Sequence, residues 1–194
     1  MTLLQDSRYL GGVNELTIIT DIRQGRVPGT SLTYLQQIQA VLDSINNREI
    51  RGIPTPIRLI STIHFARWII WKEGERYRLI FTSNYDGSMW QYLRDFSSLI
   101  ADDMDRVWDN CDGYPKGGCR DFDAFWQYVN DHRVETTAFY AAIPDESLMR
   151  RESLRAFRDA YDDFLSKTLV PGVRDHKDFY EQFCQFVREN QSYL

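Results

Sequence analysis

The sequence predicts an α+β fold of the ferredoxin-like type, in which helices cover a four-stranded antiparallel sheet. Residues 59–86 indicate two strands, because two long apolar runs are separated only by a short break around Gly74, as is typical of a β-hairpin. Strands and helices follow the order βαββαβ once two central helices are counted as one connection. Two more helices follow, so we expect one domain with a core at residues 15–145 and a helical extension at residues 146–194.

The composition is that of a globular protein, and it argues against several classes of partner. Hydrophobic residues make up 43% of the chain, which is ample for a core. A net charge of −5 gives no electrostatic reason to expect nucleic acid or an anionic membrane. No apolar run is long enough to span a membrane, and the N-terminus lacks a signal-peptide pattern. Three cysteines are too few for a disulfide framework, so we expect a cytoplasmic protein.

Two different periodicities indicate the first strand and the first helix. Alternating side chains from Glu15 to Ile22 predict the strand, and the Gly- and Pro-containing residues 23–30 predict the loop that closes it. Thr30 or Ser31 is expected to cap the helix that follows. Apolar residues then recur every three or four positions, at Leu32, Leu35, Ile38, Leu42 and Ile45.

The hairpin is unusual because its first strand is apolar on both faces. Trp68 and Ile70 share one face, while Ile69 and Trp71 share the other. An antiparallel sheet with one face in water should alternate apolar and polar side chains, so we expect this sheet to be covered on both sides. Pairing with the sheet of a second copy, as a dimeric α+β barrel, is the cover we favour. The alternative cover is the chain's own C-terminal helices.

The elements after the hairpin are indicated by caps and breaks. Ser88 followed by Gln91 is a capping-box pattern that starts a helix of more than five turns. Asp121 is expected to cap a short helix, Val134–Asp145 predicts the fourth strand, and two helices lie on either side of a break at residues 171–172. The apolar stripe of the long helix contains Met89, Leu93, Phe96, Ile100, Met104 and Val107.

Three segments carry a resemblance to a known family: TIHFARW at residues 62–68, FTSNYDGS at residues 81–88 and CDGYP at residues 111–115. In this order and spacing they resemble an uncharacterised family of bacterial ferredoxin-like proteins. The resemblance implies the ferredoxin-like fold and no activity. By fold alone it also extends to dimeric α+β barrels such as small monooxygenases, isomerases and haem-degrading enzymes, whose signature motifs are missing here.

His64 is the candidate catalytic residue, because it lies in mid-strand between apolar neighbours. An imidazole in such a place can act as a base or bind a haem iron, so haem is the one cofactor we consider. The alternative is a structural histidine, hydrogen-bonded to one neighbour. Candidate binding residues lie on the same strand or at the end of the next: Arg67, Ser83, Asn84, Tyr85 and Asp86.

These binding candidates have structural alternatives as well. Arg67 is three residues from His64 and should point to the opposite face, where an ion pair with Asp86 or Asp21 is its expected role. The strand end and helix start at residues 83–88 can bind an anion through free amides, or can simply form a capped turn.

Acidic and cysteine residues give no metal site by their spacing. Asp102, Asp103 and Asp105 lie off the apolar stripe of their helix and are expected to face solvent. Cys111 and Cys119 lack the closely spaced ligand pairs of zinc sites, and Cys111 has no basic neighbour closer than Lys116 to activate its thiol, so both cysteines are expected to be structural.

Two functions remain open from the sequence. The first is a homodimer that binds a small apolar or aromatic molecule between sheet and helices, with His64 orienting it. If that protein is an enzyme, proton transfer of the oxygenase or isomerase type is the chemistry expected. The second is a non-catalytic structural or interaction dimer whose sheet face is an interface. A cavity of a few hundred Å³ reached by His64 would favour the first.

Overall fold

The computed structural model describes residues 12–142, 147–168 and 176–193. The chain divides into two compact units, residues 1–145 and residues 146–194. No helix in the described part of the chain combines the length and the apolar character needed to cross a membrane.

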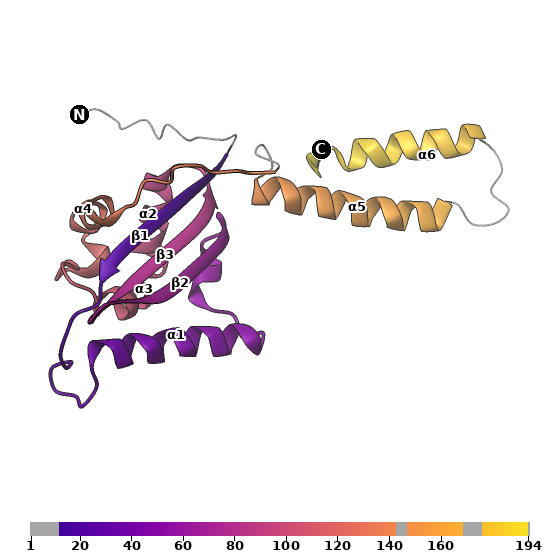
Figure 1. Cartoon of the computed structure of the whole chain (residues 1–194). Coiled ribbons are helices and arrows are strands. Elements are labelled where there is room, and N and C mark those ends of the chain that lie inside the picture. Colours follow the sequence, from indigo (N-terminus) through magenta and orange to yellow (C-terminus); the bar gives the residue numbers. More distant parts are fainter. Residues whose placement is uncertain (1–11, 143–146, 169–175, 194) are drawn as a thin grey trace. The chain divides into compact units, whose positions relative to one another are not determined.

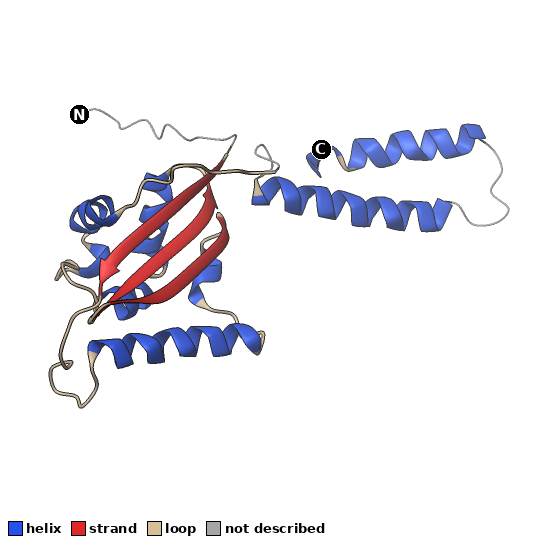
Figure 2. Cartoon of the chain, viewed as in Figure 1, coloured by secondary structure: helices blue, strands red, loops and turns tan. Residues whose placement is uncertain are grey.

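The first unit is built on a three-stranded antiparallel sheet with the order β1-β3-β2 (Figure 2). Its strands are β1 (Val13–Asp21), β2 (Ile63–Glu73) and β3 (Arg76–Asp86). The hairpin between β2 and β3 forms as expected, and Gly74 makes its turn with a φ of 60°. The central strand β3 is therefore hydrogen-bonded along both of its edges.

The prediction of a four-stranded ferredoxin-like sheet is wrong, because Val134–Asp145 does not form the fourth strand. Among the described residues, an isolated bridge between Ile18 and Arg133 and a hydrogen bond from the Val134 N–H to the Thr17 carbonyl at 2.9 Å join this region to β1 without forming a strand. The segment contains residues of high β-propensity, such as Val134, Phe139 and Tyr140, but a ladder also needs a partner edge, and the described residues after Arg133 do not pair with β1 as a strand. Residues 143–145 of the expected strand lie outside the described residues. The dimeric α+β barrel, which requires the four-stranded sheet, is wrong with it.

Helices cover one face of the sheet, which we call the inner face (Figure 1). On the opposite, outer face lies every second residue of each strand, starting from Glu15 in β1, Phe65 in β2 and Arg78 in β3. Four α-helices and two short 3-10 helices complete this unit: α1 (Tyr34–Ile50), η1 (Pro56–Leu59), α2 (Met89–Leu99), α3 (Ala101–Trp108), η2 (Gly118–Arg120) and α4 (Phe122–His132).

Two helix boundaries differ from the prediction. The capping residue of α1 is Thr33, which forms a reciprocal capping box with Gln36, and not Thr30 or Ser31. The long helix after Ser88 is broken into α2 and α3 at Ile100, which leaves the helical conformation with φ −135° and ψ 24°. Ile100 stays buried at the break, so the apolar stripe continues across it. Ser88 caps α2 by accepting a hydrogen bond from the Gln91 N–H at 3.2 Å.

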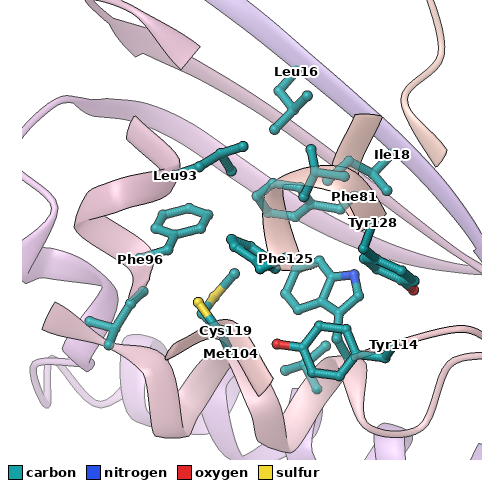
Figure 3. Close-up of a cluster of buried hydrophobic side chains, with 14 of the residues drawn as sticks. Leu16, Ile18, Phe81, Leu93, Phe96, Met104, Tyr114, Cys119, Phe125 and Tyr128 are labelled. Atoms are coloured by element: carbon teal, nitrogen blue, oxygen red, sulfur yellow. The ribbon is translucent and has the colours of Figure 1, made fainter. Parts of the chain in front are cut away.

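Aromatic side chains hold the helices on the inner face (Figure 3). Phe81 of β3 lies 5.3 Å from the ring of Trp108 on α3 and 5.3 Å from Trp68 of β2. Tyr85 stacks on Tyr92 of α2 at 4.0 Å. Such ring pairs add to the free energy gained by burying apolar surface, and they connect the central strand to two different helices.

Asp105 anchors the loop that follows α3, which corrects the expectation that it faces solvent. Its Oδ1 accepts hydrogen bonds from the Tyr114 hydroxyl at 2.6 Å and from the Cys119 N–H at 2.8 Å. Gly118 makes this approach possible, because its φ is +65° and any Cβ would lie 2.8 Å from the Asp105 Cγ. The carboxylate thus supplies the acceptor for a backbone N–H of η2 and holds the preceding loop through the Tyr114 hydroxyl.

Both cysteines of this region are buried thiols. Cys111 and Cys119 are fully inaccessible to solvent, and burial raises the pKa of each to about 12. All three cysteines of the chain are free, and Cys184 is half-buried. The two buried thiols therefore lack the thiolate that nucleophilic or metal-binding chemistry requires.

The second unit is a pair of helices, α5 (Leu148–Thr168) and α6 (His176–Glu189), followed by η3 (Gln191–Tyr193). Aromatic rings join the two helices, with Phe186 lying 4.9 Å from Phe164. The Arg150 guanidinium and the Ser153 hydroxyl both donate to the Tyr193 carbonyl. The expected break at residues 171–172 lies outside the described residues.

Replacing Gly118 by alanine should destabilise the first unit, because the methyl group would collide with the Asp105 carboxylate at a left-handed backbone position. We expect a loss of about 2–4 kcal/mol in the free energy of unfolding. Gly74→Ala is the matched control: its φ is also positive, but nothing lies within 4 Å of its Cβ position, so about 1 kcal/mol should be lost. Urea unfolding followed by tryptophan fluorescence reports this unit alone, because all five tryptophans lie in it. Equal losses for the two variants would contradict the anchoring role of Asp105.

Thiol chemistry should distinguish Cys184 from the other two cysteines. With a pKa of about 12, roughly one part in ten thousand of Cys111 or Cys119 is thiolate at pH 8. We expect a chromogenic disulfide reagent to label one thiol per folded chain quickly and three per chain in denaturant. The variant Cys184→Ser should show no fast labelling. Fast labelling that persists in this variant would mean that a buried thiol is accessible.

Candidate functional site

The structure brings only two of the six sequence candidates together, His64 and Asp86. His64 is the extra residue of a β-bulge in β2, where Ile63 pairs with Tyr85 and Phe65 pairs with Asn84. The bulge turns the imidazole toward the end of β3, where its Nε2 lies 2.6 Å from the Asp86 Oδ1. This is a charge-assisted hydrogen bond when the imidazole is protonated.

The His64–Asp86 pair is shielded from solvent. The side chain of His64 is 7% exposed and that of Asp86 is 14% exposed. An imidazole oriented by a carboxylate can serve as a general base, but a base needs a substrate within hydrogen-bond reach. The structure gives His64 a single bonded neighbour, which is the arrangement of a structural histidine, and the Nε2 that could ligate a haem iron is engaged by Asp86.

The other four candidates do not converge on this pair. Ser83 and Tyr85 point to the inner face and are buried in the core, while Asn84 lies on the outer face between them. Arg67 is exposed on the outer face of β2. The capped turn is therefore the arrangement that the structure gives to this strand end, with Ser88 capping α2.

Arg67 does not form the ion pair expected from the sequence. Asp86 is bonded to His64, and Asp21 is bonded to Arg78 at 3.0 Å. Within the described residues the Arg67 side chain has no ion pair or hydrogen bond. Its guanidinium is thus a charge held in solvent on a surface that is otherwise apolar.

That surface is a row of large apolar side chains along the outer face of β2. Phe65 is 61% exposed, Ile69 is 44% exposed and Trp71 is 56% exposed. Single exposed apolar residues are normal on a protein, but three at alternate positions of one strand are typical of an interaction surface.

Two adjoining hollows lie at the other end of the sheet. Asp86 ends β3, whereas the hollows lie beside Arg78, about 26 Å away at the rise of an antiparallel strand. The larger hollow, of about 350 Å³, is lined by Ile19, Asp21, Arg78, Asp112, His132 and Val134. The smaller hollow, of about 280 Å³, is lined by Asp21, Ile22, Gln24, Arg76 and Asp112. None of the six sequence candidates lines either hollow.

Sequence reasoning missed these residues because they come from four distant segments. Asp21 ends β1, Arg78 lies near the start of β3, Asp112 follows α3 and His132 ends α4. The one available signal was a charge pair at the ends of two predicted strands, Asp21 and Arg78, which are direct partners in the sheet. In the described part of the chain, no three His, Cys, Asp or Glu residues are grouped so that they could hold a metal ion.

Comparison with known proteins gives no family for this chain. No family model matches it, and no curated protein or solved structure matches it. The resemblance to a bacterial ferredoxin-like family stays a prediction, and function has to be argued from geometry.

Proposed function

We propose that this chain is a non-catalytic interaction protein that forms a homodimer through strand β2. The observation that carries the proposal is the exposed row of Phe65, Ile69 and Trp71 on a strand whose second edge pairs with no other described strand. A long apolar edge strand left in water tends to pair with another strand.

The two edges of the sheet differ in how their backbone groups are used. The β1 edge is met by Arg133 and by Cys111, each of which bridges to it. Among the described residues, no backbone hydrogen bond reaches the corresponding edge of β2 between Phe65 and Glu73. The N–H and C=O groups there are available for main-chain pairing of the β-augmentation kind.

The side chains of β2 are complementary to those of a second, antiparallel β2. A twofold axis at Ile70 would place Ile69 opposite Trp71 and Arg67 opposite Glu73, all on the outer face. Arg67 would gain the carboxylate that it lacks in the single chain. Glu73 already meets Arg78 at 3.0 Å, but this pair is exposed and contributes little, so Glu73 can be shared. Apolar and opposite-charge cross-strand pairs both stabilise a sheet. A second copy of this chain supplies both kinds of pair, so it is the partner that fits the edge of β2.

Small-molecule binding at His64 has less support. Neither hollow is lined by His64, and its side chain is 93% covered, so a ligand could reach it only if the surrounding residues moved. We also infer a cytoplasmic location, since three free thiols suit a reducing compartment.

A charge-reversal cycle tests this dimer. Sedimentation of the wild-type chain should show a concentration-dependent species of twice the 22.9 kDa chain mass. Arg67→Glu and Glu73→Arg should each raise the dimer dissociation constant roughly tenfold, because two like-charge pairs then face each other across the axis. The double variant should regain most of the wild-type affinity.

Lys116→Glu is the matched control, since it changes the net charge as Arg67→Glu does but lies on an exposed loop away from β2. It should leave the dissociation constant unchanged. A chain that stays monomeric at every concentration would overturn the proposal. A dimer whose affinity is indifferent to both reversals, or is not restored in the double variant, would show that β2 pairing does not hold it together.

A further inference from the structure

We propose that the groove formed by the two hollows binds a small organic cation, namely a primary ammonium with a short apolar chain. The hollows share Asp21 and Asp112, so these two residues stand between them and both hollows open onto the same carboxylates. A volume of about 350 Å³ lies within the range of small-molecule sites.

The two carboxylates differ in how far their charge is already balanced. Asp21 accepts a hydrogen bond from the Arg78 Nε at 3.0 Å and lies 3.7 Å from an Arg76 nitrogen. Asp112 uses its backbone N–H to reach the Asp21 carbonyl at 2.8 Å, but its side chain forms no ion pair within the described residues. The larger hollow, which Arg76 does not line, is therefore left with one carboxylate in excess of its arginine, that of Asp112.

Both arginines that line the groove lie beside Asp21, Arg78 within hydrogen-bonding distance and Arg76 at 3.7 Å with its side chain 67% exposed. The Arg78 guanidinium divides its donors between Asp21 and Glu73, each at 3.0 Å. An incoming anion would compete with these carboxylates for Arg78 and would be repelled by Asp112, so the groove disfavours anions.

His132 adds a second acceptor beside Asp112. Its Nδ1 lies 2.8 Å from the Tyr128 carbonyl, and since a carbonyl only accepts, the proton of the neutral ring is on Nδ1. The Nε2 of that tautomer is then an acceptor. The ring is held in place by Tyr128, whose ring centre lies 4.3 Å away. An ammonium group, with three donors and no acceptor, matches the pair of Asp112 and His132.

The remaining wall of the larger hollow is apolar. Ile19 of β1 is half-buried there, and Val134 is 41% exposed just after α4. An alkyl chain attached to the ammonium would cover part of this surface, which accounts for an amine rather than an inorganic cation as the ligand class.

Three probes of the same chain length test the charge preference: butylammonium, butanol and butyrate, each titrated into the isotope-labelled full chain at ~1–50 mM and followed by amide chemical shifts, a range suited to weak binding. Butylammonium should shift the amides of Asp112, His132 and Val134 in a saturable way. Butanol should bind about tenfold more weakly, because it lacks the charge-assisted hydrogen bond, and butyrate should not bind.

Asp112→Asn should raise the dissociation constant for butylammonium about tenfold, while Asp123→Asn, which removes the same charge at the far end of α4, should not change it. His132→Gln is a second variant whose loss of affinity tests the site independently. Equal binding of butanol and butylammonium, preferred binding of butyrate, or an unchanged affinity in Asp112→Asn would each overturn the proposal. This test does not involve β2, so its result is independent of the proposed dimer.

Discussion

The first unit depends on β3, the one strand that is hydrogen-bonded along both edges. Its inward residues Leu79, Phe81 and Tyr85 are buried and carry the contacts to the helices. Phe81 is in ring contact with both β2 and α3, so a single side chain connects the sheet to the helical layer. Hydrogen bonds along both edges and aromatic packing on the inner face hold this strand in place. The polar groups at its two ends are therefore held in place as well.

The two ends of β3 carry different chemistry for a geometric reason. At the C-terminal end, a β-bulge directs His64 to Asp86, and the resulting bond is covered. At the N-terminal end, the strand meets the loop after α3 and the end of α4, and these segments leave an open groove. A covered hydrogen-bonded pair mainly orients its own neighbourhood, whereas an open groove with a carboxylate that has no ion pair among the described residues can meet a ligand.

The three-stranded sheet also determines which strand edge is left available for a partner. Because the segment after α4 contributes one bridge and no strand, β1 is partly covered at its edge, while β2 is left with a free edge and apolar side chains on its outer face. A fourth strand would not have changed this, since it would have joined the β1 side. The unpaired Arg67 lies within the same apolar row, where a partner strand that supplies a carboxylate would meet it.

Local patterns in the sequence determined the hairpin turn at Gly74, the Ser88 cap, and the apolar stripe of α2 and α3, because each depends on a few neighbouring residues. The tertiary structure decided the rest. The fourth strand does not form, because a ladder depends on a partner edge and not only on the composition of the strand. The predicted long helix is interrupted at Ile100, whose side chain stays buried in the core. His64 reaches Asp86 only because of a β-bulge, and the spacing of residues in the sequence gives no sign of this bulge. The groove joins side chains 57, 34 and 20 positions apart along the chain, from Asp21 through Arg78 and Asp112 to His132, and contacts at such separations exist only once the chain has folded.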